Sequence, residues 1–325
     1  MSINREWVKH SVFLFIIGGA LTTGFMNCSQ QGFSPTQSSS ADLGSQGTPG
    51  TNASPTPTAT PATSPNLSAG CGNAGAATGY TTVTSVVDGN NTRRSFGLEV
   101  SSAYKSTTPM ALTLIFHGAG GDSANARSFG LNQATGALAS SIMVYPQGIQ
   151  FQNYGVGWND GCNGYDMPFF DNILTYVENN YCIDKNRVYV GGFSWGCDFS
   201  TALACCRASK IRAIAAASCS DEFGNASDYR TYGNTCPATT THPPIRFTHA
   251  PKEDGAYPAP FFATTSQLYQ SWNGCTNTAT TAISPTGCVS FNSCKSQLIE
   301  CTNVSGHSLP NNWNNDTWSF FSQFK

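Results

Sequence analysis

The residues best placed to do chemistry lie near the middle of the chain, in the segment 192–196, which reads Gly-Phe-Ser-Trp-Gly. A short run of β-branched and aromatic residues at 188–190 predicts a strand just before it. A Gly-x-Ser-x-Gly sequence between a strand and a helix is typical of a nucleophile elbow, a sharp turn that raises the serine hydroxyl above the sheet. Gly192 and Gly196 are required because a Cβ at either position would collide with the crossing strand or helix. We therefore expect Ser194 to be a nucleophile; the alternative is a structural turn rich in glycine and serine.

A serine hydroxyl is a weak nucleophile at neutral pH, so it needs a histidine to take its proton and a carboxylate to orient that histidine. In hydrolases with this type of elbow, the order along the chain is serine, acid, histidine. That order excludes His10 and His117, which precede the serine. Three histidines remain: His242, His249 and His307.

His307 is the expected base among these three. It lies in a loop between the last expected strand, 297–302, and a closing helix expected at 315–324, which is where the histidine of such a fold belongs. His242 stands beside two prolines and is expected to be a loop residue. His249 ends a strand and is expected to brace the acid loop.

The acid is expected to be Asp254, which follows a strand expected at 245–248. An aspartate in a loop is usually solvated, but the position after a late strand favours a role at the site. Glu253 is its neighbour and stays an alternative, and Asp221, after the previous strand, is a third.

A glycine-rich loop, 117–121, follows a continuous apolar run at 111–116 that predicts a buried strand. Glycines there allow backbone N–H groups to face a ligand, as in the oxyanion hole of an esterase. We expect the N–H groups of Ala119 and Trp195 to form that hole, and His117 to hold the shape of the loop. The alternative is a phosphate-binding loop, which is disfavoured because no Gly-Lys-Ser/Thr ending follows.

From Cys71 onward, strands and helices are expected to alternate along the chain. Strands are expected at 81–87 and 95–101, which form a hairpin with Asp88-Gly89-Asn90 as its turn, and then at 111–116, 141–145, 188–190, 211–217 and 244–248. Helices are expected from the N-cap Asp122 towards Ala134, at 166–180 and at 197–207. This alternation predicts an α/β fold with a mainly parallel sheet and helices on both faces, whose functional residues gather at the carboxyl ends of the strands.

Residues 1–28 read as an export signal, with positive charge first and then an apolar run at 11–25. That run is about fifteen residues long, shorter than the roughly 20 needed to span a bilayer as a helix. Cys28 directly after it resembles the acylated cysteine of a bacterial lipoprotein signal, although the preceding residue is Asn27 where a small residue is usual. We expect a lipid anchor at Cys28, with plain secretion as the alternative.

Residues 29–70 are rich in Ser, Thr, Pro, Gly, Ala and Gln and are expected to be a disordered linker, followed by one folded domain at 71–325. A flexible coil of about forty residues would reach on the order of 35 Å, enough to hold a domain away from a membrane. The plainer interpretation is a spacer left after signal cleavage.

The composition limits the partners of the chain. Charged residues make up 10% and the net charge is −2, so neither a nucleic-acid surface nor a polybasic membrane patch is expected. The chain has 13 cysteines, an even twelve if Cys28 is set aside, without the paired spacing of a zinc site. We expect several disulfides and an oxidising compartment. Cys205 and Cys206 point about 100° apart on a helix, so they should pair with different partners.

At the candidate nucleophile, base and glycine-rich loop, the chain resembles secreted feruloyl esterases and the related polyhydroxybutyrate depolymerases. The shared features are Gly-Phe-Ser-Trp-Gly, the His-Gly loop at 117–118, the lead-in 186–189, Trp158, Cys162 and Asp166, and Gly306-His307 with Pro310. The resemblance covers 71–325 and implies the α/β-hydrolase fold, with Ser194 as nucleophile and His307 as base. It also implies an acid in a His-Gly-Thr-x-Asp-type loop, which favours Asp254 because Pro258 stands at the family's distance after it.

Three departures from that family pattern stand out. Ala250-Pro251 replaces Gly-Thr with one extra residue before the aspartate, which keeps Glu253 open as the acid. Leu309 stands where Trp is common, beside the base, where it can alter substrate preference. Cys197-Asp198 stands where Gly and an apolar residue are usual.

These features together predict an exported serine ester hydrolase that acts through an acyl-enzyme and needs no metal or cofactor. Feruloyl or acetyl esters on plant polysaccharide are the expected substrates, because no further polymer-binding domain is visible; polyhydroxyalkanoate is the alternative. A catalytically inactive surface binding protein and an acyltransferase on the same fold stay open. No nucleic acid is expected as a partner, and contact with a membrane only through the anchor at Cys28.

Overall fold

The computed structural model describes residues 64–152, 155–219, 242–252, 254–257 and 259–325. The expected export signal with Cys28, most of the expected linker, and Asp221, Glu253 and Pro258 lie outside the described residues. None of the helices in the described ranges is both long enough and apolar enough to cross a membrane.

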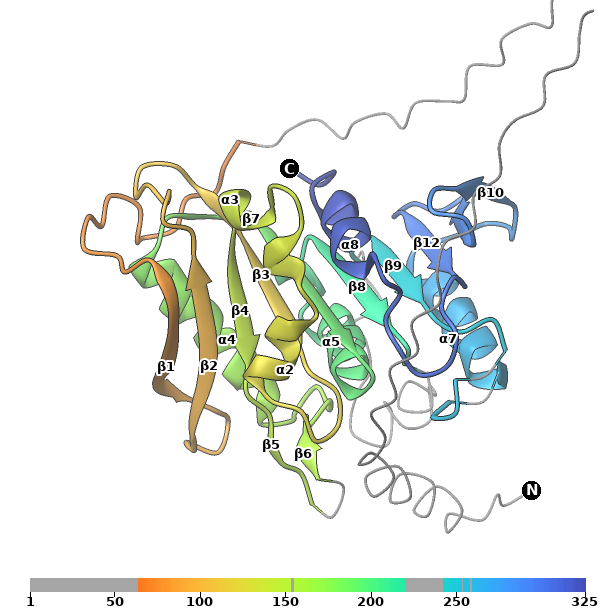
Figure 1. Cartoon of the computed structure of the whole chain (residues 1–325), viewed down its shortest axis with the longest axis horizontal. Helices are drawn as coiled ribbons and strands as arrows, with labels where there is room; N and C mark the ends of the chain where they lie inside the picture. The colour runs from red at the N-terminus through yellow and green to blue at the C-terminus, as the bar shows by residue number, and fades with distance from the viewer. Residues whose placement is uncertain (1–63, 153–154, 220–241, 253, 258) are drawn as a thin grey trace, which may run out of the picture. The chain divides into compact units, whose positions relative to one another are not determined.

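One large sheet dominates the described part of the chain. Its ten strands are β1 (Gly79–Val87), β2 (Arg93–Val100), β3 (Met110–Phe116), β4 (Ser141–Pro146), β7 (Ile183–Phe193), β8 (Ala213–Ala217), β9 (Ile245–Thr248), β10 (Thr280–Ile283), β11 (Cys288–Phe291) and β12 (Leu298–Cys301). They lie in the order β1-β2-β4-β3-β7-β8-β9-β12-β11-β10 (Figure 1). The six central strands, from β4 to β12, are parallel, and antiparallel strands extend the sheet at both edges. The prediction of a mainly parallel sheet is therefore confirmed.

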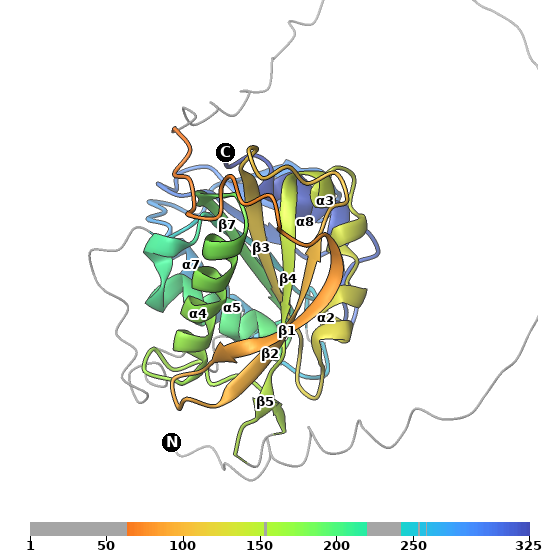
Figure 2. The ribbon, with the colours of Figure 1, turned by 90° about the vertical axis from the view of Figure 1, so that its left-hand side faces the viewer.

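Helices cover both faces of the sheet, as predicted. They are α2 (Ser123–Ser128), α3 (Ala137–Ser140), α4 (Asp166–Asn180), α5 (Trp195–Cys206), α7 (Ala259–Trp272) and α8 (Trp313–Phe321), with short 3-10 turns at Leu131–Gln133 and Ala208–Lys210. Helices α4, α5 and α7 lie on one face, and α2, α3 and α8 lie on the other (Figure 2). A separate small hairpin consists of β5 (Ile149–Gln150) and β6 (Val156–Gly157).

Strand β3 shows how the sequence produces this layered arrangement. All seven of its residues are buried, as its continuous apolar run predicts. Leu112, Leu114 and Phe116 pack into the core beneath α4 and α5, whereas Ala111 and Ile115 pack beneath α8. Side chains alternate between the two faces of a strand, so a strand covered on both faces is largely apolar. The one polar side chain of β3, Thr113, is hydrogen-bonded to the hydroxyl of Ser141 at 2.7 Å.

Helix α4 has the predicted bounds and the predicted buried face, which consists of Phe169, Phe170, Ile173, Leu174 and Val177. These residues recur at the spacing of one helix face. Each fully buried aromatic or aliphatic side chain contributes roughly 1.5–3 kcal/mol by its removal from water. This helix is anchored by its apolar stripe.

The opening hairpin and the cap of α2 are also confirmed, but the helix is shorter than expected. Asp88 Oδ1 accepts the amides of Asn90 and Thr92 in the turn between β1 and β2. Asp122 Oδ1 accepts the amide of Asn125 at 2.7 Å, so it is the N-cap. The helix does not run towards Ala134, because Gly130 adopts a left-handed φ of 78° that ends the helical course.

The domain begins to make contacts before Cys71. Asn66 donates its amide to Asp184 Oδ1 at 3.0 Å, and Ser68 Oγ donates to the carbonyl of Tyr181 at 2.6 Å. The disulfide Cys71–Cys182 closes the same corner. The segment 66–71 is thereby attached to the start of β7.

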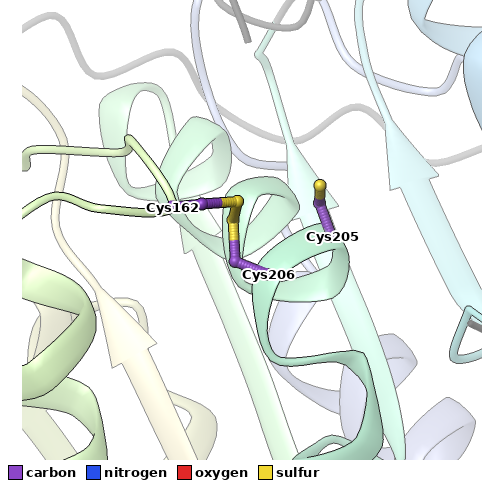
Figure 3. A group of neighbouring side chains, drawn as sticks. All are labelled: Cys162, Cys205 and Cys206. Atoms are coloured by element: carbon purple, nitrogen blue, oxygen red, sulfur yellow. A yellow bond between two sulfur atoms is a disulfide. The ribbon is translucent and has the colours of Figure 1, made fainter. Parts of the chain in front are cut away.

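Five disulfides join cysteines of the described ranges: Cys71–Cys182, Cys162–Cys206, Cys197–Cys219, Cys275–Cys294 and Cys288–Cys301. The prediction of several disulfides is confirmed. Cys205 is also disulfide-bonded, and Figure 3 shows its sulfur separate from the Cys162–Cys206 bond. The sulfur atoms of Cys162, Cys205 and Cys206 lie within 4.8 Å of one another, as in a metal site. Each belongs to a disulfide and lacks the thiolate that a metal ion would bind.

Candidate active site

Ser194 occupies the turn between β7 and α5 with a φ of 55° and a ψ of −128°. A positive φ at a residue other than glycine is uncommon and stores strain, which tends to occur at functional sites. The turn is tight enough to require both glycines, since a Cβ on Gly192 would lie 2.2 Å from the Gly196 oxygen. A Cβ on Gly196 would lie 2.2 Å from the oxygen of Phe116, at the end of β3. The expected collisions are confirmed, and the backbone of Ser194 is fixed by its neighbours.

The glycine-rich loop after β3 passes directly beside this serine. A Cβ added to Gly118 would lie 3.0 Å from the Cβ of Ser194. The amide of Gly120 donates to Val156 in the β5–β6 hairpin at 2.8 Å, and the amide of Gly121 donates to Gly118 at 3.1 Å. Because the amides of Gly120 and Gly121 are engaged, Ala119 stays our predicted donor of this loop to an oxyanion.

Trp195 is the first residue of α5, where the geometry of a helix leaves the backbone N–H without an intrahelical acceptor. Its N–H therefore stays the second predicted oxyanion donor. The indole ring is buried against Gly157, at which a Cβ would lie 2.3 Å from the ring, and meets Phe151 edge-on with a centroid distance of 5.9 Å. The ring of Trp195 is therefore packed between the β5–β6 hairpin and Phe151.

His117 supports the loop with both of its ring nitrogens. Nδ1 lies 2.8 Å from the Gly118 carbonyl, and Nε2 lies 2.9 Å from the amide of Gly148. A carbonyl can only accept and an amide can only donate, so the imidazole is neutral with its proton on Nδ1. Burial lowers its pKa, which favours the same neutral form. These bonds fit the expectation that His117 holds the loop.

The structure brings Asp254 and His307 together. His307 Nδ1 lies 2.8 Å from Asp254 Oδ2. The other carboxylate oxygen accepts the amides of Ala256 at 3.0 Å and Tyr257 at 2.7 Å, so the carboxylate is held from both sides. A carboxylate on Nδ1 fixes the tautomer that leaves Nε2 as a proton acceptor. The side chain of His307 is 25% exposed, enough to reach a substrate from the site.

The ring of His307 packs on the residue before the serine. The centroids of Phe193 and His307 are 4.7 Å apart. The hydroxyl of Ser218 donates to the carbonyl of Ser308 at 3.4 Å, and the amide of Ser218 donates to Thr248 at 2.8 Å. The loops after β8, β9 and β12 are therefore connected to one another around the elbow.

The other downstream histidines have different surroundings. His242 Nδ1 lies 3.1 Å from the Ala204 carbonyl, and its ring stacks on Trp272. His249 Nδ1 lies 2.6 Å from the Ala250 carbonyl, and its Nε2 lies 2.8 Å from Glu300 Oε1. Both nitrogens of His249 are engaged just before the acid loop, which fits the expectation that it braces that loop.

A tyrosine and an aspartate that the sequence analysis did not assign to the site also lie at Ser194. The Tyr257 hydroxyl donates to Asp198 Oδ2 at 3.0 Å, and the amide of Asp198 donates to the carbonyl of Ser194 at 3.1 Å. Asp198 stood out only as a departure from a family pattern, and nothing in the spacing connected it to a tyrosine 59 residues away.

Comparison with known proteins supports the architecture. The acetyl xylan esterase of Aspergillus awamori matches 75% of this chain and 99% of its own, with a TM-score of 0.61 at 17% identity. The ferulic acid esterase of Anaeromyces mucronatus, solved with ferulic acid, matches 75% of this chain and 89% of its own, with a TM-score of 0.51 at 13% identity. The chain has the α/β-hydrolase fold. No family model matches it.

Within this fold, the sequence is similar to feruloyl esterases, as the resemblance of its motifs indicated. Feruloyl esterase D of Neurospora crassa is 34% identical over 160 residues, which are 46% of this chain. The chain spans about half the length of that relative, 52%.

Proposed function

We propose that this α/β-hydrolase is a serine ester hydrolase in which Ser194, His307 and Asp254 form the catalytic triad. The observation that carries the proposal is the bond of 2.8 Å between His307 Nδ1 and Asp254 Oδ2, because it leaves the second ring nitrogen to act as a base. The ring bearing that nitrogen packs on Phe193, which directly precedes the strained serine.

The mechanism follows from these positions. Nε2 of His307 takes the proton of Ser194 as Oγ attacks the ester carbonyl carbon, and the carbonyl π electrons move onto oxygen. The N–H groups of Ala119 and Trp195 are the proposed donors to that oxyanion, and each donor of this kind contributes about 10²–10³ in rate. The intermediate collapses, and the departing alcohol takes the proton from His307. Water, with His307 again as base, then attacks the acyl-enzyme and releases the acid.

The proposed substrates are feruloyl or acetyl esters of plant polysaccharide. The similarity to feruloyl esterases supports this class. A comparison of methyl ferulate with polyhydroxybutyrate tests the choice. Faster turnover of methyl ferulate is expected, and hydrolysis of the polyester alone would contradict the assignment.

We further propose that the protein works outside the cytosol, because disulfides of this number form in oxidising compartments. A lipid on Cys28 stays our prediction for its attachment. Growth with a labelled fatty acid should label the wild type and leave a Cys28→Ala variant unlabelled. An unlabelled wild type would rule out the anchor.

Replacement of the nucleophile tests the activity itself. Ser194→Ala should abolish hydrolysis of p-nitrophenyl acetate while the protein keeps its circular dichroism spectrum and melting temperature. Turnover equal to that of the wild type would refute the proposal. Addition of an alcohol acceptor distinguishes hydrolysis from acyl transfer, since a transferase would form the new ester in preference to free acid.

A further inference from the structure

A buried ion pair joins strand β2 to the first residue of helix α4. Arg94 Nη1 donates to Asp166 Oδ1 at 2.6 Å, and both side chains are completely buried. The second carboxylate oxygen of Asp166 accepts the backbone amide of Asn159 at 2.7 Å. A buried ion pair is weak as a source of stability because both groups lose their hydration, so what it holds in place matters more.

Asp166 holds a segment that supports the glycine-rich loop from one side. The amide that it accepts belongs to Asn159, directly after Trp158. Trp158 is fully buried, its ring stacks on Phe199, and its Nε1 donates to the carbonyl of His117 at 2.9 Å. The carboxylate therefore acts on the backbone of the loop through the N–H of this indole.

Arg94 holds the loop from the other side. Its Nη2 donates to the carbonyl of Gln147 at 2.9 Å, directly before Gly148. The amide of Gly148 donates to Nε2 of His117 at 2.9 Å, which keeps the imidazole in the tautomer that carries its proton on Nδ1. The two members of the ion pair thus act on the same histidine, one on its carbonyl and the other on its ring.

The contacts of His117 fix the direction of the Ala119 N–H, our predicted donor to the oxyanion. Nδ1 of His117 donates to the carbonyl of Gly118 at 2.8 Å, and the amide of Gly121 donates to the same oxygen at 3.1 Å. A peptide unit is planar and trans, so its N–H points opposite to its C=O. The unit that contains the Gly118 carbonyl also contains the Ala119 N–H, so holding the carbonyl orients the donor.

We propose that Arg94 and Asp166 are positioning residues that orient the oxyanion donor, the N–H of Ala119. They act through Trp158 and His117. The inference rests on the proposed function, because this donor serves the oxyanion of the ester reaction. A preorganised donor lowers the barrier because it needs no reorganisation as charge develops on the oxygen. Its displacement should slow turnover more than it weakens substrate binding, since the ground-state carbonyl carries little of that charge.

A purely structural role makes a different prediction. An aspartate at the start of a helix also stabilises the helix dipole, and an ion pair between β2 and α4 joins two elements whatever the protein does. Loss of such a role would lower the melting temperature and leave kcat unchanged at a temperature well below melting.

The test compares the two carboxylates that share Arg94. Asp88 Oδ2 also accepts Arg94 Nη1, at 3.1 Å, but its other oxygen accepts amides of the β1–β2 turn. Asp88→Asn and Asp166→Asn remove the same charge, and each leaves Arg94 with one of these two carboxylates. With p-nitrophenyl acetate, Asp166→Asn should lower kcat about tenfold and leave KM within about threefold, because its single oxygen stays with Arg94 and the amide of Asn159 loses its acceptor. Asp88→Asn should retain the wild-type kcat.

Two outcomes would overturn the inference. One is an equal kcat for the wild type and Asp166→Asn, and the other is an equal fall in kcat for Asp166→Asn and Asp88→Asn. An inactive wild type would instead refute the proposed function.

Variants of tryptophan keep the test decisive if Asp166→Asn does not fold. Trp158→Phe removes the N–H from the carbonyl of His117. Trp318→Phe makes the same change at a buried tryptophan of α8, on the other face of the sheet. Trp158→Phe should lower kcat about tenfold with KM within about threefold, and Trp318→Phe should retain kcat. The same kcat in these two variants would also overturn the inference.

Discussion

Two histidine-bearing loops meet at Ser194, and their difference shows how the fold separates support from chemistry. In the loop after β3, His117 is fully buried and both of its ring nitrogens are bonded to backbone groups. In the loop after β12, His307 is 25% exposed on its side chain, and its Nδ1 is bonded to Asp254. An imidazole whose two nitrogens are occupied can shape a loop, whereas proton transfer needs a nitrogen that can reach the substrate site. Whether both ring nitrogens are hydrogen-bonded to the protein therefore distinguishes the supporting histidine from the proposed base better than closeness to the serine does.

The largest expected effect separates the two histidines directly. His307→Ala should lower kcat for p-nitrophenyl acetate by at least about 10³-fold with a nearly unchanged melting temperature, because it removes the base and few buried contacts. His117→Ala should lower the free energy of unfolding by about 2–3 kcal/mol, because it leaves buried backbone groups unpaired. Turnover and thermal unfolding measure both. Full activity in His307→Ala would contradict the assignment of the base.

The orientation of the base gives the next effect. Asp254→Asn keeps an oxygen for the amides of Ala256 and Tyr257, but its amide group would face Nδ1 and favour the wrong tautomer. We expect kcat to fall by about 10³–10⁴-fold while folding is retained. A kcat within tenfold of the wild type would place the acid elsewhere, and Glu253→Gln is then the variant to measure.

Two glycines in the loop after β3 test its closeness to the serine. Gly118→Ala would place a Cβ 3.0 Å from the Cβ of Ser194, so the loop must shift, and kcat should fall about 10- to 100-fold. Gly120→Ala meets no atom within 4 Å, but its φ of 71° is unfavourable for alanine. It should cost about 1 kcal/mol of stability and retain kcat. Equal kcat for the two variants would show that the loop does not contact the site.

The smallest effect is on stability at mildly acidic pH. Burial lowers the pKa of His117 in the folded protein below the ordinary histidine pKa of about 6.5, which it has in the unfolded chain. Just below pH 6.5, the unfolded chain therefore binds a proton at His117 that the folded protein does not. The free energy of unfolding should therefore be highest above about pH 6.5 and fall as the pH drops below it. His117→Gln should flatten this slope in urea unfolding, with a remainder from His242, whose pKa burial also lowers. An unchanged slope would contradict the neutral, buried state of His117.

Local patterns predicted much of the fold. The elbow could be predicted because Gly192, Ser194 and Gly196 act within one turn, where sterics alone decide. Helix α4 could be predicted because its apolar residues recur on one face. By contrast, the early end of α2 depends on a left-handed Gly130, which lies within an otherwise helical pattern.

Contacts across long stretches of the chain were harder to predict. Asp254 and His307 are 53 residues apart, and only the order of such residues in a known fold suggested that they meet. Helix α7 and the edge strands β10 and β11 were not predicted. Strand β10 is mostly exposed, so it lacks the apolar signal that marked β3. The Tyr257–Asp198 pair depends on the packing of the acid loop onto α5, which no local pattern records.

The most direct test of Ser194 as an activated nucleophile is labelling with a fluorophosphonate, followed by mass spectrometry of the digested protein. The adduct should lie on the peptide that contains Ser194, and His307→Ala should label far more slowly because its serine lacks a base. Absence of labelling in the folded wild-type protein, or an adduct on another residue, would contradict the hydrolase mechanism and favour a protein that keeps the fold only for binding.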